Sequence, residues 1–204
     1  MIGIVDYGLG NVKAFANIYS ALDVPFVVAR TPDELSSADK LILPGVGAFD
    51  QAMHRLQESG MREELDRRVL QGGVPVLGVC VGMQILMRSS SEGSSPGLSW
   101  VDGDVVKFEA GAVQQPLHVP HMGWNDVQPV RPNALLDGLA EQARFYFLHS
   151  YFVRCNVEQD ILARTRYGSE FACALNHANI YGVQFHPEKS HGYGIQLLKN
   201  FAEL

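Results

Sequence analysis

A cysteine framed by two glycines is the residue of this sequence with the clearest chemical potential. Cys80 lies in the run 78–82, between the apolar stretch 74–77 and a helix-like stretch, 83–87. A strand that turns sharply into a helix leaves no room for side chains beside its tip, so glycines two residues before and after are typical of a nucleophile elbow. Backbone N–H groups and the dipole of the following helix would favour thiolate, the reactive form. An inert buried cysteine is the competing interpretation.

A second motif supplies a base and a carboxylate. The apolar run 181–185 leads into His186, Pro187 and Glu188. Residues two apart in an extended chain point the same way, so we expect His186 and Glu188 on one side, with Pro187 fixing the backbone between them. A thiolate nucleophile requires a base that takes and returns its proton, and that base requires an orienting acceptor. Cys80, His186 and Glu188 therefore predict acyl transfer from an amide.

The motifs around this triad extend along the chain. Five segments carry them in order: 6–11, 44–49, 78–84, 121–125 and 184–190. Together they resemble the glutaminase subunits of imidazole glycerol phosphate synthase, within the class I (triad) glutamine amidotransferases. The resemblance covers essentially the whole chain. The sequence departs from the family pattern at two places. Val81 stands where leucine is commoner, and Val101, Asp102 and Gly103 stand where the family often has Ile, Pro and Gly. Neither departure touches a catalytic position.

The order of the expected elements indicates an α/β fold. Strands at 2–6, 25–29 and 40–43 alternate with helices at about 11–22, 49–58 and 62–70. This alternation predicts a mostly parallel open sheet flanked by helices. The family that the sequence resembles has such a flavodoxin-like three-layer arrangement. From 105 to 184 the pattern changes to strands and turns, including 123–127, 144–148, 161–165 and 171–175, which predicts an antiparallel extension of that sheet. We expect a single domain, 1–204, with a mobile loop at 89–97.

Composition limits the remaining function classes. The chain has 204 residues, 47% of them hydrophobic, and no apolar run approaches the roughly 18 residues of a membrane span. A net charge of −6 without a Lys/Arg cluster argues against a nucleic-acid surface. Three cysteines at unrelated spacings form neither a disulfide framework nor a zinc pattern, and the other histidines show no ligand spacing. The run 8–10 lacks the rest of a dinucleotide fingerprint. We expect a cytoplasmic protein with no metal and no cofactor.

The tetrahedral intermediate of amide attack needs N–H donors for its oxyanion. The elbow supplies one from the backbone of Val81. A second is expected from Val46 and Gly47, which follow the strand 40–43 at the end where Cys80 also lies. The resemblance implies that the orientation of this segment depends on a partner, whereas the simpler interpretation is an ordinary strand-to-helix turn.

The resemblance also assigns substrate and partner residues. The glutamine pocket would be lined by Gln84, Glu92, Ser150 and Tyr151. A glutamate in a Gly/Ser loop is equally well explained as a solvated charge. The implied partner is a (βα)8-barrel cyclase subunit, contacted by Asn11, Trp124, Tyr146 and Lys189. Tryptophan is common at interface hot spots, although core packing would explain Trp124 as well.

The function implied is hydrolysis of glutamine to glutamate and ammonia through a thioester on Cys80. Ammonia would pass to the cyclase, which makes imidazole glycerol phosphate and AICAR in L-histidine biosynthesis. Three alternatives stay open: the glutaminase of pyridoxal phosphate synthesis, a cysteine amidase or peptidase of related fold, and a catalytically silent partner-binding subunit. The run around Trp124 and the segment 188–190 argue against the first, and the intact triad argues against the last.

Overall fold

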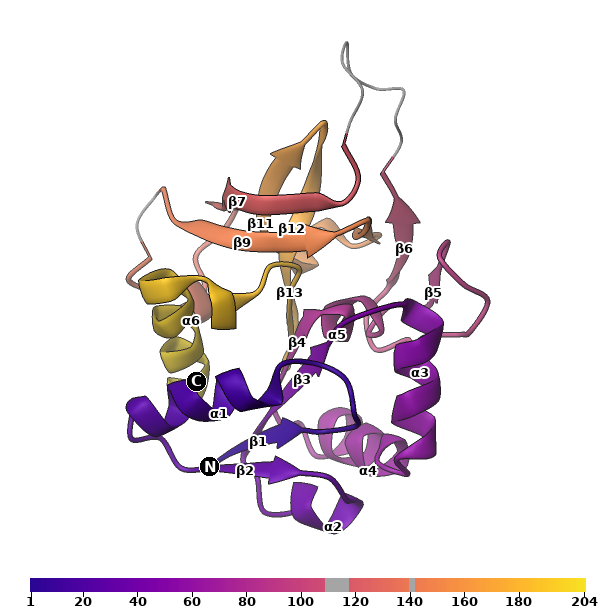
Figure 1. The fold of residues 1–204 in the computed structure, drawn as a ribbon, viewed down its shortest axis with the longest axis vertical. Helices are drawn as coiled ribbons and strands as arrows, with labels where there is room; N and C mark the ends of the chain where they lie inside the picture. The colour runs from indigo at the N-terminus through magenta and orange to yellow at the C-terminus, as the bar shows by residue number, and fades with distance from the viewer. Residues whose placement is uncertain (109–117, 140–141) are drawn as a thin grey trace.

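An eight-stranded sheet forms the centre of the computed structural model, which describes residues 1–108, 118–139 and 142–204 (Figure 1). In spatial order its strands are β2 (Phe26–Ala29), β1 (Ile2–Val5), β3 (Lys40–Gly45), β4 (Val76–Cys80), β13 (Ile180–Val183), β12 (Ser169–His177), β11 (Ile161–Tyr167) and β8 (Gln128–Pro129). The pairs from β2 to β13 are parallel, and those from β13 to β8 are antiparallel. The prediction of a mostly parallel sheet with an antiparallel extension is therefore confirmed.

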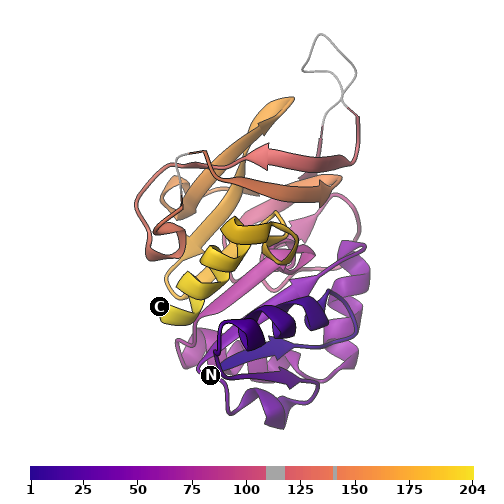
Figure 2. The same ribbon diagram turned by 60° about the vertical axis from the view of Figure 1, so that its left-hand side comes forward.

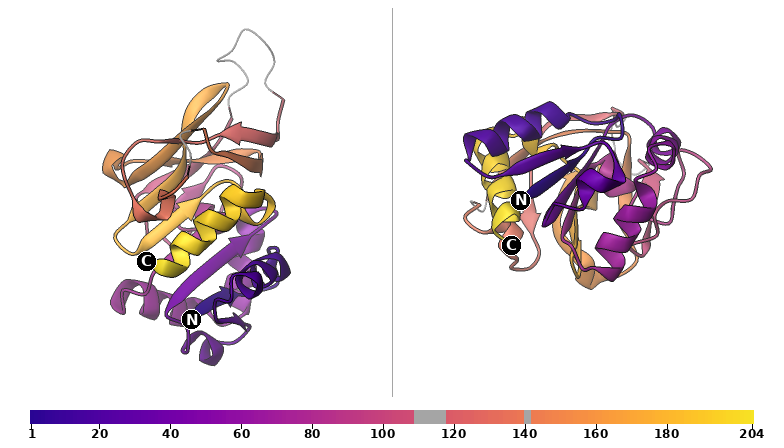
Figure 3. Two further views of the ribbon diagram at one scale, coloured as in Figure 1. Left: turned by 90° about the vertical axis from the view of Figure 1, so that its left-hand side faces the viewer. Right: turned by 90° about the horizontal axis from the view of Figure 1, so that it is seen from below.

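Helices cover both faces of the sheet. Helices α1 (Val12–Ala21) and α6 (His191–Glu203) lie on one face, and α3 (Phe49–Glu58) and α4 (Arg62–Asp66) lie on the other (Figure 3). The α4 helix continues as a π-helical turn, Arg67–Gln71. The hydroxyl of Tyr19 in α1 donates to the carbonyl of Leu198 in α6 at 3.3 Å, which joins the two helices. Within the described part of the chain, no helix has the length and apolar character to cross a membrane.

Several short elements complete the chain. Helix α2 (Pro32–Leu35) is not expected from the strand and helix periodicities, although Thr31 and Glu34 form a capping box at its start. The elbow turn α5 spans Val81–Gln84. Three 3₁₀ turns are η2 (Ala134–Leu136), η3 (Glu158–Asp160) and η4 (Pro187–Lys189).

Two small sheets lie beside the large one and correct the predicted extension. Strand β7 (His121–Asp126) pairs with β9 (Arg144–His149), and β6 (Gly103–Lys107) joins β10 (Tyr151–Cys155) to β5 (Ser89–Ser90). The expectation that 123–127 and 144–148 extend the main sheet is therefore wrong. The inner face of β9 packs on the main core through Phe145, whose ring stacks on Phe185 at 4.1 Å. Figure 2 shows β7 and β9 crossing above α6.

The segment 89–97, expected to be a mobile loop, begins with β5 and is attached to α3. Backbone N–H groups of Ser94 and Ser95 donate to the carboxylate of Asp50 at 2.9 and 3.0 Å. These two hydrogen bonds lower the pKa of Asp50. The contacts hold the segment beside the start of α3, next to the carboxyl ends of the central strands.

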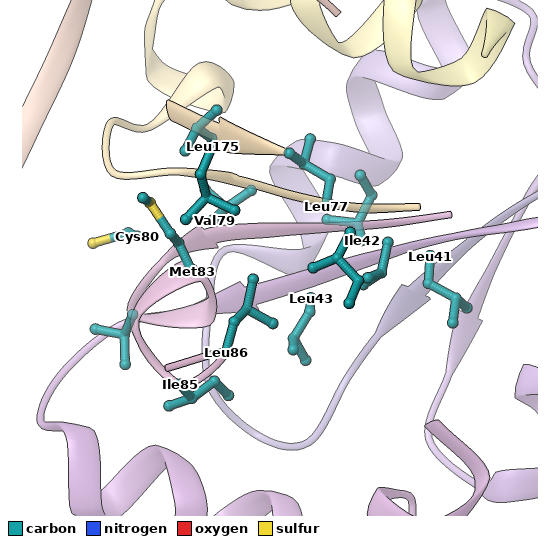
Figure 4. Packing of buried hydrophobic residues seen from close by; sticks show 14 of the residues in the cluster. Leu41, Ile42, Leu43, Leu77, Val79, Cys80, Met83, Ile85, Leu86 and Leu175 are labelled. Carbon is teal, nitrogen blue, oxygen red and sulfur yellow. The ribbon is translucent and has the colours of Figure 1, made fainter. Parts of the chain in front are cut away.

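Buried apolar side chains fill the part of the core where β3, β4 and β13 meet under the elbow. Leu43, Leu77 and Val79 project from the strands, and Met83 and Leu86 pack against them from the chain that follows Cys80 (Figure 4). All five side chains are buried. Strands buried on both faces carry continuous apolar runs, which explains why the sequence identifies this part of the sheet readily.

Candidate active site

Cys80 occupies a backbone conformation that few side chains adopt. Its φ is +55° and its ψ is −112°, at the tip where β4 turns into α5. A Cβ added to Gly82 would overlap the carbonyl oxygen of Leu43, and one added to Gly78 would lie 2.6 Å from the carbonyl oxygen of Gly82. Both framing glycines are therefore required sterically, as the elbow interpretation predicts.

The expected helix after the elbow is a single turn. It covers Val81–Gln84 rather than continuing to Met87 as a regular helix, because the carbonyls of Gln84 and Met83 accept turn-type bonds from Met87 and Leu86. A helix this short has a small dipole, so the environment of the sulfur depends mainly on its near neighbours. The Cys80 thiol donates to the carbonyl of Leu148 at 3.9 Å.

His186 and Glu188 lie together as the spacing predicts. The Nδ1 atom of His186 is 2.9 Å from Oε1 of Glu188, and both side chains are buried. Burial opposes protonation of the imidazole, but interactions with the sulfur of Cys80 and the carboxylate of Glu188 outweigh it and raise the pKa of His186. An imidazole bonded through Nδ1 presents Nε2 to other partners, which suits a base beside a thiol.

A hydroxyl that the sequence interpretation does not assign holds the backbone of this histidine. Ser190 is buried and donates to the carbonyl of His186 at 2.6 Å, while its oxygen accepts from the N–H of Tyr146 at 3.0 Å. The N–H of His186 donates to the carbonyl of Tyr146 at 2.8 Å. The backbone N–H of His186 is therefore attached to β9 directly, and its carbonyl is attached to β9 through the hydroxyl of Ser190.

A cavity of about 300 Å³ joins the expected site residues, at the lower end of the size range for small-molecule pockets. Ten of the expected residues line it: Val46, Gly47, Cys80, Val81, Gln84, Glu92, Ser150, Tyr151, His186 and Lys189. Glu188 lies behind His186. Among the residues that the structure describes, no three His, Cys, Asp or Glu side chains form a group that could hold a metal ion.

Strand register brings the expected oxyanion segment beside Cys80. Gly45 on β3 pairs with Cys80 on β4, so Val46 and Gly47 follow directly beside the elbow. A Cβ on Gly45 would lie 2.5 Å from the backbone nitrogen of Gly82, and Gly47 has a φ of +87°. The close approach requires glycine at the first position and the positive φ favours it at the second.

The expected substrate residues differ in how they are held. The Nε2 atom of Gln84 donates to the carbonyl of Tyr151 at 2.9 Å and to Oε1 of Gln184 at 3.1 Å. Glu92 is not a free solvated charge, because its Oε2 accepts from the N–H of Phe49 at the start of α3 at 2.8 Å. Ser150 is half-buried between β9 and β10.

Sequence reasoning does not single out the side chain of Gln184, yet that side chain reaches Cys80. Its Nε2 donates to the sulfur of Cys80 at 3.8 Å, and the residue is buried completely. An amide at the end of an apolar strand, two residues before His186, is the only signal in the sequence. Glutamine is mostly an exposed residue, so burial beside a thiol is informative.

Two buried histidines lie at the cavity wall and directly behind it. His149 lines the cavity, and its Nδ1 is 2.8 Å from the carbonyl of Tyr151. A carbonyl only accepts, so Nδ1 carries the proton and Nε2 accepts from Nδ1 of His121 at 2.9 Å. Burial lowers the pKa of His121 to about 4 and that of His149 to about 3. Both rings are therefore neutral at pH 7, in the tautomers that this chain of bonds requires.

Three of the four expected partner residues form one cluster. Trp124 on β7 pairs across the sheet with Tyr146 on β9, with the rings 6.2 Å apart, and Nζ of Lys189 lies 5.8 Å from the Tyr146 ring centre. Trp124 is 39% exposed, so it is not a core residue, and it stacks on His191 at 5.3 Å. Asn11 is exposed at the start of α1, and among the described residues no hydrogen bond joins it to this cluster.

This fold, with a cysteine elbow and a histidine sharing one cavity at the carboxyl ends of parallel strands, is that of the triad glutamine amidotransferases. The family model described as "Glutamine amidotransferase class-I" matches residues 3–204. A solved structure, described as a crystal structure of glutamine amidotransferase, has the same fold, with a TM-score of 0.76 at 19% identity over 100% of this chain and 99% of that one.

Curated relatives narrow the class. The chain is 59% identical over 204 residues to "Imidazole glycerol phosphate synthase subunit HisH" of Bdellovibrio bacteriovorus, and 52% identical to the protein of the same name from Leptospira interrogans, with 100% of each chain covered in both cases. The chain belongs to the HisH family of class I glutamine amidotransferases, which makes it a glutamine-hydrolysing enzyme. The resemblance inferred from the five segments is confirmed, and the pyridoxal phosphate alternative is not favoured.

Proposed function

We propose that Cys80 is the nucleophile that hydrolyses glutamine to glutamate and ammonia, and that the ammonia passes to a cyclase subunit. One observation carries the proposal: Cys80, in a strained elbow, shares a cavity with His186, whose other ring nitrogen is 2.9 Å from Glu188. Strain at a functional residue persists only where the surrounding packing enforces it, as the glycines around Cys80 do.

The first half of the reaction forms the thioester. The thiolate of Cys80 attacks the side-chain amide carbon of glutamine, and the oxygen of that amide becomes an oxyanion. Backbone N–H groups of Val81 and of the segment containing Val46 and Gly47 stabilise this charge. Protonated His186 gives its proton to the amide nitrogen, the C–N bond breaks, and ammonia leaves.

The second half returns the enzyme to its starting state. A water molecule attacks the thioester while His186 takes one of its protons, and the same N–H groups stabilise the second oxyanion. The C–S bond then breaks and leaves the thiolate of Cys80 beside protonated His186. The new carboxyl group loses the other proton of the water to solvent, and glutamate is released. The raised pKa of His186 favours this ion pair at neutral pH, and Glu188 orients the ring and stabilises its charge.

Substrate recognition is proposed for the polar groups on the cavity wall. Gln84, Ser150, Tyr151 and Glu92 present side-chain and backbone groups there. The second carboxylate oxygen of Glu92, Oε1, is suited to the α-ammonium group of glutamine, because Oε2 already accepts a hydrogen bond from the N–H of Phe49. A site with fixed donors and acceptors rejects analogues that leave a buried polar group unpaired.

The partner we propose is a (βα)8-barrel cyclase that makes imidazole glycerol phosphate and AICAR in L-histidine biosynthesis. The names of the relatives, each a subunit of imidazole glycerol phosphate synthase, support this partner. The exposed Trp124, with Tyr146 and Lys189 beside it, offers an aromatic and cationic surface of the type found at interface hot spots. We further propose that Asn11 contributes to this surface and that 1–204 acts as one domain in the cytoplasm, where its three free thiols stay reduced.

Replacing the nucleophile in the assembled complex tests the proposal. Cys80→Ala should lower glutamine-dependent synthesis by at least about a thousandfold, because no other group can form the thioester. Synthesis supplied with ammonium salt should stay near the wild-type rate, since the cyclase then needs no glutaminase. The control is Cys155→Ala, which changes a cysteine outside the cavity and should alter neither rate. Equal losses with glutamine and with ammonium would contradict the role of ammonia donor.

A further inference from the structure

Gln184 is the buried side chain that touches both the nucleophile and a residue of the substrate pocket. It lies just after β13, with 0% of its surface exposed, and its backbone N–H donates to the carbonyl of Cys173 at 2.9 Å. Its side-chain amide contacts Gln84 through one end and the sulfur of Cys80 through the other. A buried amide that satisfies its hydrogen bonds on two functional residues is costly to replace.

The neighbouring groups fix which end of the amide faces the sulfur. The carbonyl of Tyr151 only accepts, so the Gln84 atom beside it is the nitrogen. The second hydrogen of that nitrogen points to Gln184, whose facing atom must be the oxygen. The remaining atom of the Gln184 amide, 3.8 Å from the sulfur of Cys80, is therefore the nitrogen, and it donates.

We infer that Gln184 is a positioning residue for the reaction: its amide holds Gln84 in place and donates an N–H to the thiolate of Cys80. This inference rests on the proposed function. A hydrogen bond to the charged form of a group stabilises that form, so the N–H favours thiolate over thiol. With both hydrogens of the Gln84 nitrogen used, its Oε1, which has no partner among the described residues, is presented as an acceptor at the cavity.

Other titratable groups also act on the sulfur and must be separated from this effect. The titratable groups facing Cys80 or lining its cavity are Tyr7, Glu92, His149, Tyr151, His186, Glu188 and Lys189. These groups can change charge with pH, whereas the Gln184 amide carries no charge at any pH. A substitution at Gln184 therefore removes its hydrogen bonds to Cys80 and Gln84 and leaves all seven of these groups in the protein.

The first experiment removes the donor and measures the thiol directly. Gln184→Met keeps the length of the side chain but has no N–H, and the rate of Cys80 alkylation by iodoacetamide would be followed against pH by mass spectrometry of the Cys80 peptide. We expect the midpoint to rise by about one pH unit, in line with the loss of a hydrogen bond to a charged group, and the KM for glutamine to rise severalfold. The matched control is Asn200→Leu, which removes a buried amide that donates to the carbonyls of Leu135 and Asp137 and accepts from Nε2 of Gln196; none of these groups lines the cavity, so the midpoint should stay unchanged.

The second experiment uses the wild-type protein and needs no folded variant at Gln184. The side-chain amide signals of Gln184 in an NMR titration should shift with the same midpoint as Cys80 alkylation, and the shift should disappear in Cys80→Ala. The amide signals of Asn200 should stay constant. A reactive Cys80 whose ionisation leaves the Gln184 signals unmoved, or an unchanged midpoint in folded Gln184→Met, would overturn the inference alone. A Cys80 that is inert to alkylation in the wild type would instead contradict the proposed function.

Discussion

The parallel and antiparallel halves of this molecule hold their functional groups by opposite means. In the parallel half, around β3 and β4, the position of Cys80 depends on missing side chains, because Gly45, Gly78 and Gly82 let three backbone segments touch. In the antiparallel half, around β7 and β9, the wall of the cavity depends on hydrogen bonds that join two imidazole rings and a backbone carbonyl. Cys80 is thus fixed by sterics, and the wall of the cavity is fixed by polar and aromatic contacts.

The aromatic packing of the second half explains why its polar groups can be buried. The ring of His121 lies between Tyr167 and Phe147, with ring centres 4.1 and 4.7 Å away. Phe171 packs against His149 at 5.5 Å. Apolar rings exclude water from the two imidazoles, which then satisfy each other through the His121–His149 hydrogen bond.

The largest effect is expected from a substitution that disrupts the close packing of the parallel half. Gly82→Ala places a Cβ against the carbonyl of Leu43, and only a backbone shift relieves the overlap. We expect a loss of at least about 3 kcal/mol in the free energy of unfolding, as for severe overpacking of a core, and loss of glutaminase activity. Chemical denaturation and a glutaminase assay measure the two quantities.

The control for this change is Gly192→Ala in α6. A Cβ at Gly192 would meet no atom of the described residues within 4 Å, and its φ is not positive. Its free energy of unfolding should change by less than about 1 kcal/mol. Equal effects at Gly82 and Gly192 would mean that close packing at the elbow does not fix the nucleophile.

A smaller effect is expected in the antiparallel half, where the free energy of unfolding should depend on pH through two buried histidines. Burial lowers the pKa of His121 to about 4 and that of His149 to about 3, whereas the unfolded chain binds these protons near pH 6.5. The unfolded state therefore binds more protons below pH 6.5, and the stability that these neutral rings support is lost as pH falls from about 6.5 toward 4. His186 acts in the opposite sense, because its raised pKa stabilises the folded state at low pH.

Urea denaturation at pH 7 and pH 5 measures this dependence. His121→Phe keeps an aromatic ring between Tyr167 and Phe147 but removes one titrating group, so its loss of stability between these pH values should be smaller than that of the wild type by about 1–2 kcal/mol. The exposed residue His54 supplies the control His54→Gln, which should follow the wild type. An unchanged pH dependence in His121→Phe would show that the pair is not held neutral.

The smallest expected effect concerns the outer face of the antiparallel half. Trp124→Ala should weaken binding of the cyclase subunit about 10- to 30-fold, the loss typical of a tryptophan hot spot. The isolated chain should lose less than about 1 kcal/mol, because this side chain is exposed at the surface and is not part of the core. Leu70→Ala, at an exposed position just before the amino end of β4, is the control and should bind normally. Titration calorimetry with the purified cyclase measures the affinities, and normal affinity of Trp124→Ala would remove this face from the interface.

The parallel half of the molecule is predicted well from the sequence, whereas the arrangement of the antiparallel half is not. Helix α3 has the predicted bounds, Phe49–Glu58, and β1 and β2 agree within a residue, because alternating buried strands and amphipathic helices leave local patterns. The Cys80 elbow follows from the spacing of its glycines, and the His186–Glu188 contact follows from the spacing of two residues.

Features that depend on distant contacts leave no such pattern. The separation of β7 and β9 from the main sheet depends on packing such as Phe145 against Phe185, forty residues away along the chain, and alternation of polar and apolar residues is the same in either arrangement. The side-chain amide of Gln184 reaches Cys80 only because β13 lies beside β4. The shortness of α5 depends on turn bonds after Gln84 that apolar periodicity does not reveal.

Covalent labelling of the three cysteines tests the central claim most directly. The protein would be incubated with a glutamine-like diazo ketone and analysed by peptide mass spectrometry, with and without excess glutamine. Burial raises the pKa of both Cys155 and Cys173, so neither competes as a thiolate. The account predicts label on Cys80 alone, prevented by glutamine and slowed in His186→Ala. Label on another cysteine, or none on Cys80, would contradict the assignment of Cys80 as the nucleophile.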